Sequence, residues 1–415
     1  MSLSNPAERE RLLAEGRTAD LIAGQLVRAG VLVAQPERRN ATELGGCRCS
    51  GSAEDRQSRW IIEGGMAVTG SPGARIPIGV YRGRGCGIPA IGVYENFIGR
   101  PVQKVLDFMV EKPTTWAQFE NGNLTGTADV SAWQGVLGPR QLVLGVPACC
   151  GASTGSGGTT WADEANGAND AHWKALGNRL IGLGLGGALL RIGREFNGSW
   201  YPWQVTEGNQ ASYIAGYQHV VDVLRALPGA AFRFCWSPIL GVGNLTARGA
   251  ESCYPGDGYV DEIGLDVYDF SKKNSAGAQI YPGNAAATTA AQQQQVLDIM
   301  LTEWDSLRGW YSLALNHGKP LSFPEWGLVL WKSGSSYYGG GDNPVFIRAM
   351  ADFIGGCSLL GWHAMWEDPW GAGVCDPDTT HGRPIPAPMS RTAFLEAFGS
   401  QAASPAAVGP MPQAA

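Results

Sequence analysis

Two glutamates occupy positions in the sequence where catalytic carboxylates would be expected. Glu195 lies in "LLRIGREFNGSWYPW" (residues 189–203) and Glu325 lies in "KPLSFPEWGL" (residues 319–328), each at the end of an apolar segment. A charge at the end of a buried strand costs free energy unless it is paired or used. If the fold brings both carboxylates to one cleft, they could cleave a glycosidic bond with retention, as an acid/base and a nucleophile about 5–5.5 Å apart.

Neighbouring side chains could set the protonation of these two glutamates. Arg191 lies in the same segment as Glu195, and Tyr268 ends the segment "IGLDVYDF". Both could reach Glu325 and favour its charged form, because hydrogen bonds to a carboxylate stabilise the ionised state. Burial beside aromatic rings could keep a proton on Glu195 near neutral pH. Asn197 could orient Glu195 or bind a sugar hydroxyl.

Aromatic residues gather around the same segment ends. Sugar rings present flat C–H faces that stack on aromatic side chains, and an apolar floor with a few polar groups is typical of a ligand site. The predicted substrate contacts are the aromatic side chains and two acids on or just after the segment ends: Trp200, Tyr201, Trp203, Trp236, Trp326, Trp366, Glu367 and Asp368.

Short apolar segments alternate with helical patterns along the chain, which predicts an α/β fold of the (β/α)8 TIM-barrel type. Candidate strands are 90–94, 104–110, 141–147, 187–193, 231–236, 262–267, 319–324 and 358–364, and candidate helices are 168–183, 209–227, 288–316 and 343–354. A doubly wound sheet is the rival, but no G-x-G-x-x-G follows an early strand. In a barrel, residues after each strand meet at one face. The fourth and seventh strands, which carry Glu195 and Glu325, lie opposite each other there.

The ends of the chain differ from the predicted barrel of residues 61–400. Residues 1–60 predict an N-terminal extension, with an amphipathic helix over 6–34 followed by a polar linker, and 401–415 predict a disordered C-terminal tail. No apolar run is long enough to span a membrane, and the N-terminus lacks the features of a signal peptide. The net charge of −6 argues against a nucleic-acid partner.

The nine cysteines form no regular ligand framework, so buried thiols or one or two disulfides are expected. No His, Asp and Glu cluster has metal-ligand spacing, and the predicted chemistry requires no metal or cofactor.

Four segments together resemble glycoside hydrolase family 26, the β-mannanase-type retaining enzymes. In order, they are "LLRIGREFNGSWYPW", "CWSPIL", "YPGDGYVDEIGLDVYDF" and "LSFPEWGL", which resemble that family's fourth to seventh strands. The resemblance covers roughly residues 88–370. It implies that Glu195 is the acid/base, Glu325 the nucleophile, Tyr268 its hydrogen-bond partner and Arg191 a support. It also implies sugar contacts for Trp200, Trp203, Trp236 and Trp366.

Two positions depart from the family pattern. The family usually has histidine before the acid/base, where this chain has Arg194, and usually Phe-Gly or a similar pair after the nucleophile, where this chain has Trp326-Gly327. Both departures lie beside the chemistry, so they indicate a distant member or a sister family and leave mannan in doubt as the substrate. Mixed-linkage or β-1,3-glucan, β-1,3-xylan and actinobacterial wall polysaccharide stay open.

Other interpretations remain at this point. Glu195 could form a structural ion pair with Arg191 or Arg194. The barrel could bind carbohydrate without cleaving it, or residues 1–60 could anchor a glycan-degrading module to a larger assembly such as a phage virion. A polysaccharide or oligosaccharide is the expected partner in each case, and the sequence leaves the cellular location undetermined.

Overall fold

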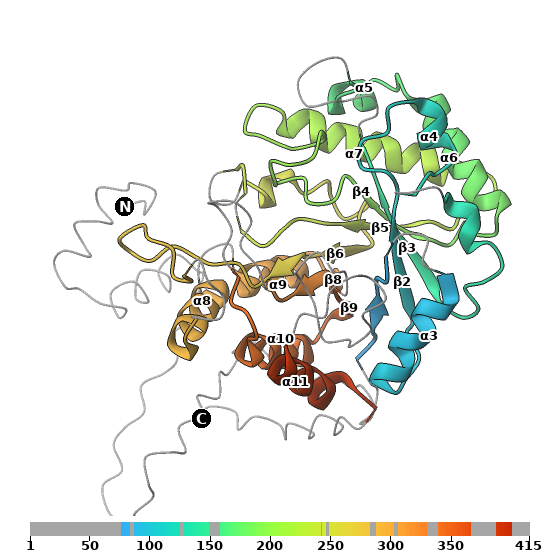
Figure 1. The fold of residues 1–415 in the computed structure, drawn as a ribbon. Coiled ribbons are helices and arrows are strands. Elements are labelled where there is room, and N and C mark those ends of the chain that lie inside the picture. The colour runs from blue at the N-terminus through green and yellow to red at the C-terminus, as the bar shows by residue number, and fades with distance from the viewer. Residues whose placement is uncertain are drawn as a thin grey trace, which may run out of the picture. The chain divides into compact units, whose positions relative to one another are not determined.

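The described residues form a barrel of parallel strands surrounded by helices. The structure, a computed structural model, describes residues 76–83, 87–124, 128–148, 158–241, 243–245, 249–282, 288–302, 306–329, 339–366 and 387–400. Its strands are β1 (Gly79–Val80), β2 (Lys104–Phe108), β3 (Gln141–Val146), β4 (Leu189–Ile192), β5 (Arg233–Trp236), β6 (Glu262–Gly264), β7 (Val267–Tyr268), β8 (Leu321–Gly327) and β9 (Leu360–Met365). Figure 1 shows these strands enclosed by the helices.

The strands fill eight barrel positions, with β6 and β7 sharing the sixth. Each strand from β1 to β5 pairs in parallel with the next, both β6 and β7 pair with β8, and β8 pairs with β9. Parallel bridges from Ile78 to His363 and from Tyr81 to Trp366 join the last position to the first. The predicted (β/α)8 barrel is therefore confirmed.

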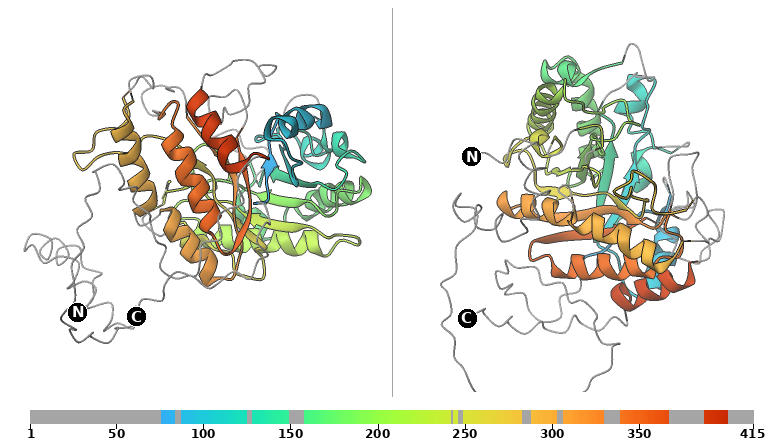
Figure 2. Two further views of the ribbon diagram at one scale, coloured as in Figure 1. Left: turned by 90° about the horizontal axis from the view of Figure 1, so that it is seen from below. Right: turned by 90° about the vertical axis from the view of Figure 1, so that its left-hand side faces the viewer.

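Helices cover the outside of the barrel. They are α3 (Gly87–Ile98), α4 (Trp116–Glu120), α5 (Trp161–Ala165), α6 (Asp170–Gly182), α7 (Gln210–Arg225), α8 (Ala290–Thr302), α9 (Leu307–Asn316), α10 (Pro344–Gly356) and α11 (Pro388–Phe398). Figure 2 shows α8, α10 and α11 running beside one another on one side of the sheet.

Side chains alternate between two cores along the strands, as the period of two requires. On β2, Leu106 belongs to the barrel interior and Val105 to the layer between strands and helices. On β4, Leu189 belongs to the barrel interior and Leu190 to the layer between strands and helices. The parallel strands are apolar on both faces because both faces are covered.

The predicted strand over 90–94 is wrong, because these residues lie within α3. Ile91, Tyr94 and Ile98 are buried at helical spacing, whereas Val93 is 43% exposed. A short apolar run does not by itself distinguish a strand from one turn of a buried helix. The first strand is instead β1, where a Cβ on Gly79 would come within 2.9 Å of the Trp362 ring.

The predicted helix over 288–316 is two helices, α8 and α9, and the Ser306 side chain caps the second by accepting from the Gly309 amide. Cys235, Cys253 and Cys357 are buried free thiols. The other six cysteines, the 1–60 extension and the 401–415 tail lie outside the described residues. Within the described parts of the chain, no helix has both the length and the apolar character needed to cross a bilayer.

Candidate active site

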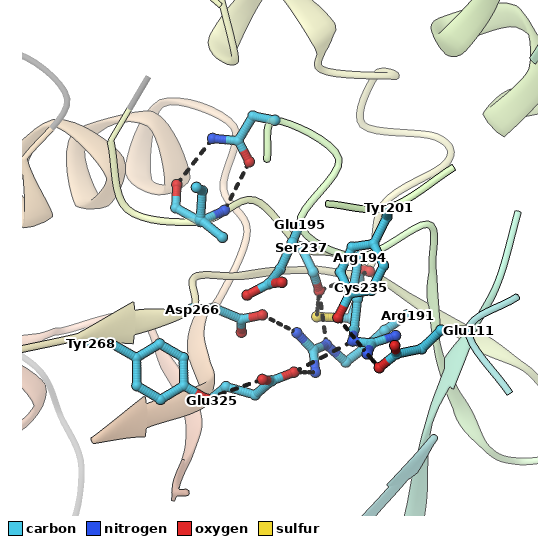
Figure 3. A network of polar contacts seen from close by, with 12 residues as sticks. Glu111, Arg191, Arg194, Glu195, Tyr201, Cys235, Ser237, Asp266, Tyr268 and Glu325 are labelled. Atoms are coloured by element: carbon cyan, nitrogen blue, oxygen red, sulfur yellow. Dashed lines mark hydrogen bonds and ion pairs between the residues drawn. The ribbon is translucent and has the colours of Figure 1, made fainter. Parts of the chain in front are cut away.

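Three carboxylates meet at the C-terminal end of the barrel strands. Glu195 follows β4, Asp266 lies between β6 and β7, and Glu325 is on β8. One oxygen of each lies within 4.8 Å of one oxygen of each of the others. All three side chains are at least nine-tenths buried, and Figure 3 shows them converging from separate elements. The structure thus brings together the two glutamates that the sequence singled out, although 130 positions separate them.

Arg191 lies at the centre of this cluster and is completely buried. Its Nη1 donates to Glu325 Oε1 at 2.6 Å, its Nη2 to Asp266 Oδ2 at 2.5 Å and its Nε to Ser237 Oγ at 3.0 Å. Burial alone would lower the pKa of Arg191, but the two carboxylates outweigh burial and raise it above its usual value. Arg191 therefore pairs with Glu325 and Asp266, so these contacts do not support a structural ion pair between Arg191 and Glu195.

Glu325 accepts a second hydrogen bond from the sixth barrel position. The hydroxyl of Tyr268 donates to Glu325 Oε2 at 3.1 Å (Figure 3). Burial, followed by the charge of Glu325, raises the pKa of the Tyr268 phenol well above its usual value, so the phenol keeps its proton as a donor. Both oxygens of Glu325 are therefore occupied by donors, and the carboxylate has a fixed orientation.

Glu195 has a different environment, which favours the protonated form. Burial first, and then the charge of Glu325, raises the pKa of Glu195 to about 7. The indole nitrogen of Trp200 donates to Glu195 Oε2 at 2.7 Å. Glu195 thus has the environment of a carboxyl group that holds its proton near neutral pH, as a general acid requires.

The backbone of Glu195 is left-handed, with φ of +53°, and among the described non-glycine residues only Glu195 has a positive φ. Its amide donates to the carbonyl oxygen of Ser237 at 2.6 Å. Gly193, two positions earlier, also has a positive φ, of +57°. Left-handed backbone is strained for a residue with a Cβ, and such strain persists where surrounding contacts fix it, often in active sites. The tight turn after β4 directs the carboxylate back over the barrel.

Arg194 closes one side of the site. Its guanidinium lies between the rings of Phe108 and Tyr201, 4.4 and 4.8 Å from their centroids. Nη2 donates to Glu111 Oε1 at 2.9 Å and to Tyr201 Oη at 2.8 Å, and Nε lies 3.7 Å from Glu325 Oε1. Arg194 is thus a second fixed cation beside Glu325, at the position where the family usually has histidine.

Asn197 is completely buried and joins the β4 and β5 loops. Its side-chain oxygen accepts from the Ile239 amide at 2.9 Å, and its nitrogen donates to the carbonyl groups of Ile239 and Gly241. It supports the turn that carries Glu195. The expectation that Asn197 could bind a sugar hydroxyl is wrong, because no part of its side chain reaches solvent.

Three of the predicted aromatic contacts are wrong, because Trp203, Trp236 and Trp326 are fully buried. Neighbouring side chains on a strand point to opposite faces. Since Glu325 faces the barrel interior, Trp326 must face the helices, where it packs on Phe346 and donates to His363 Nδ1.

Trp236 likewise packs outside the barrel and donates to the Tyr213 hydroxyl at 2.8 Å. Trp203 donates to the Arg194 carbonyl at 2.8 Å and stacks on Tyr201. These two residues therefore support the site from behind.

The remaining predicted contacts are accessible or lie outside the described residues. Trp200 is 41% exposed beside Glu195, and Tyr201 is half-buried against Arg194. Trp366, at the end of β9, is half-buried and stacks on Tyr81 with ring centroids 4.3 Å apart. Glu367 and Asp368 lie outside the described residues.

Asp266 was not among the site residues predicted from the sequence. A signal for it was present, because Asp266 interrupts the apolar segment "EIGLDV" and stands two positions before Tyr268. Burial raises the pKa of Asp266 well above its usual value, while the ion pair with Arg191 opposes the shift. Its Oδ1 has no hydrogen-bond partner.

The acidic residues of the site do not form a free set of metal ligands. Among the described residues, Glu195, Asp266 and Glu325 form the group of acids close enough to share an ion. The guanidinium of Arg191 already contacts two of these three carboxylates, at 2.5 and 2.6 Å. A cation would have to compete with that buried guanidinium, so the donor set does not fit a resident metal.

The comparisons with known proteins agree with the predicted resemblance. The model of a family described as Glycosyl hydrolase family 26 matches residues 187–312. The match includes Arg191, Glu195 and Tyr268 and ends before Glu325. Residues 187–312 are therefore similar to that family, as the four segments indicated.

Two relatives match shorter parts of the chain. Endoglucanase H of Acetivibrio thermocellus is 32% identical over 122 residues, which are 28% of this chain and 13% of that protein. A mannan endo-1,4-beta-mannosidase of Bifidobacterium adolescentis is 37% identical over 76 residues, 18% of this chain and 8% of that protein. The chain thus matches only a small part of the length of either relative.

Solved structures resemble this chain at low sequence identity. An endo-beta-1,4-mannanase double mutant from Cellulomonas fimi matches with a TM-score of 0.50 and 17% identity, covering 78% of this chain and 71% of that one. A GH26 beta-mannanase from Bacteroides ovatus matches with a TM-score of 0.48 and 17% identity, covering 78% and 88%. At 17% identity, the likeness to the Cellulomonas fimi structure concerns the fold alone.

Proposed function

We propose that the chain is a retaining endo-β-glycosidase that hydrolyses a polysaccharide by double displacement. The observation that carries the proposal is that carboxylate oxygens of Glu195 and Glu325 lie within 4.8 Å of each other. Retaining enzymes place the two carboxyl groups about 5–5.5 Å apart, whereas inverting enzymes leave about 6.5–9.5 Å for a water molecule. The raised pKa of Glu195 and the two donors that hold Glu325 support the same assignment.

In the first step Glu325 attacks the anomeric carbon while Glu195 gives its proton to the departing glycosidic oxygen. The C–O bond to the leaving sugar breaks and an ester bond to Glu325 forms. Arg191 and Tyr268 fix Glu325 in the orientation for attack, since each donates to one of its oxygens. The pKa of Glu195, about 7, suits an acid that must hold its proton until this step.

In the second step Glu195 acts as a base. Once Glu325 is an ester it carries no charge, so one of the two causes that raise the pKa of Glu195 disappears. The pKa of Glu195 then falls and its carboxylate takes a proton from water, whose oxygen attacks the anomeric carbon. The ester bond breaks, Glu325 regains its charge, and the product has the configuration of the substrate.

The substrate we propose is a β-linked polysaccharide. The relatives' names include a mannosidase and an endoglucanase, so β-1,4-mannan and β-glucan come first in a substrate panel. Trp200 and Trp366 are the aromatic side chains placed to stack on sugar rings, because Trp203 and Arg194 already pack against the ring of Tyr201. Because Trp200 lies beside the proton donor, it can bind the leaving sugar, which favours cleavage within a chain.

The first test is hydrolysis of a panel of mannan, β-glucans, β-1,3-xylan and wall polysaccharide, followed by NMR of the first products. We expect products of β configuration that mutarotate afterwards. Initial products of α configuration from a β-linked substrate would overturn the retaining scheme. Tight binding without turnover across the panel would instead support a barrel that binds carbohydrate without cleaving it.

The second test assigns the two roles with azide on an activated aryl β-glycoside. Glu325→Ala should lose about 10⁴-fold or more in kcat, and azide should restore turnover with an α-glycosyl azide as product. Glu195→Ala should lose about 10²–10⁴-fold, and azide should then give a β-glycosyl azide. If Glu325→Ala gave the β-glycosyl azide and Glu195→Ala the α-glycosyl azide, the roles of nucleophile and acid/base would have to be exchanged.

A further inference from the structure

Asp269 is a buried carboxylate that the proposed mechanism does not use. It directly follows Tyr268, the hydrogen-bond donor to Glu325, and its side chain is 1% exposed. The Tyr281 hydroxyl donates to Asp269 Oδ1 at 2.7 Å and Asn343 Nδ2 donates to Oδ2 at 2.9 Å. The carboxylate is tightly enclosed, because a Cβ added to Gly340 would come within 2.1 Å of Oδ2.

These contacts tie together three segments that are separate in the sequence. Tyr281 belongs to the loop that follows β7, and its amide donates to Ser271 Oγ at 2.9 Å. Asn343 caps α10 by accepting from the Phe346 amide at 3.0 Å. The backbone amide of Asp269 donates to the carbonyl of Gly327, two positions after the nucleophile, at 3.0 Å.

The strand that Asp269 terminates is short. β7 has only two residues, Val267 and Tyr268, paired with Trp326 and Gly327 of β8. Beyond these two pairs, the end of β7 is held by Asp269, whose backbone amide donates to the Gly327 carbonyl and whose carbonyl accepts from the Gly340 amide. The position of the Tyr268 ring therefore depends on how the chain is anchored immediately after it.

We propose that Asp269 is a positioning residue for the reaction, which holds the end of β7 so that the Tyr268 hydroxyl meets Glu325. This inference rests on the proposed function of Glu325 as nucleophile. Asp269 touches none of the reacting atoms and acts through Tyr268. Loss of its two hydrogen bonds lets the end of β7 move, and a small displacement of Tyr268 breaks a contact that is already 3.1 Å long.

The test uses Asp269→Asn with Glu164→Gln as a matched control. Each change replaces a buried carboxylate that accepts two side-chain hydrogen bonds by an amide of the same shape, which can accept only through its single oxygen. Glu164 accepts from Trp173 Nε1 at 2.6 Å and Asn169 Nδ2 at 3.0 Å, outside the candidate active site.

The first measurement needs no substrate. In protein labelled with [13Cζ]tyrosine, the Tyr268 resonance is identified by its absence from Tyr268→Phe. We expect this resonance to move in Asp269→Asn and in Tyr281→Phe and to keep its position in Glu164→Gln. An unchanged Tyr268 resonance in Asp269→Asn, or an equal change in Glu164→Gln, would overturn the proposal.

The second measurement is a double-mutant cycle on the substrate that the panel identifies. Asp269→Asn should lower kcat roughly tenfold, as expected for one lost hydrogen bond, with little change in KM. In the Tyr268→Phe background it should cause no further loss. A full additional tenfold loss there would show that Asp269 does not act through Tyr268. If Glu325→Ala leaves turnover unchanged, the proposed function fails, while the NMR result still decides the placement of Tyr268.

Discussion

Replacing Glu325 with glutamine removes one negative charge from the immediate surroundings of Glu195. The glutamine keeps the size of the side chain and can still accept from Arg191. Because the charge of Glu325 is the second cause of the raised pKa of Glu195, we expect that pKa to fall in Glu325→Gln. The burial of Glu195, which is the first cause, is left in place.

The size of the fall follows from the distance between the two carboxylates. Two unit charges separated by 4.8 Å interact by about 3.5 kcal/mol at an effective dielectric constant of about 20. This energy corresponds to about 2.5 pKa units. The guanidinium groups of Arg191 and Arg194 screen part of the interaction, so we expect the pKa of Glu195 to fall by about one to two units.

The assay is a 13C NMR titration of protein labelled at the glutamate side-chain carboxyl. The Glu195 signal is identified by its absence from Glu195→Gln. Wild-type Glu195 should titrate at about 7, and the signal in Glu325→Gln should titrate at lower pH. Glu164→Gln, which alters another buried carboxyl whose pKa burial raises to about 7, should leave the Glu195 titration unchanged.

Two results would refute this reasoning. An unchanged pKa of Glu195 in Glu325→Gln would mean that the two carboxylates do not interact electrostatically, which contradicts the separation on which the mechanism depends. A higher pKa of Glu195 would mean that the glutamine side chain does not occupy the position of Glu325 and that Glu195 has become more deeply buried. In either case the change from acid to base between the two steps would lose its physical basis.

Three further predictions concern neighbouring residues. Trp200→Phe removes a hydrogen bond that lowers the pKa of Glu195, so the basic limb of the kcat/KM profile should move to higher pH; a shift to lower pH would contradict this account. Arg191→Met leaves the buried Asp266 carboxylate without its ion pair and should lower the free energy of unfolding by about 3–5 kcal/mol in urea titrations. This deficit should shrink as the pH falls, because Asp266, whose pKa burial raises in the folded state, then takes up a proton. Trp236→Ala, which empties a fully buried site between barrel and helices, should cost about 3–5 kcal/mol in the same assay, and a loss under about 1 kcal/mol would argue against that packing.

The sequence predicted the barrel and the meeting of Glu195 with Glu325 because both depend on regular patterns. Strand ends in a (β/α)8 barrel share one face, so position along the chain translates into position in space. The same regularity, applied consistently, would have placed Trp326 outside the barrel, since Glu325 beside it faces inward. That error came from treating neighbouring residues on one strand as a single surface.

Other features could not be derived from local patterns. The first strand is too short to stand out, since β1 has two residues and one of them is glycine. The accessibility of Trp200 depends on the path of the loop after β4, and loop paths follow no periodic rule. The contacts of Asp269 join residues up to 74 positions apart and have no sequence signature.

Because Glu195 has a left-handed backbone, a substitution that raises the unfolding temperature at this position would lower the rate of turnover. Glycine adopts a φ of +53° without steric penalty, and relief of such strain is worth about 1–3 kcal/mol. Glu195→Gly also removes a carboxyl group from a buried position. We therefore expect this variant to unfold at a higher temperature than the wild-type protein while turning over almost no substrate. Selecting variants for heat resistance alone would then tend to discard Glu195, the proposed acid.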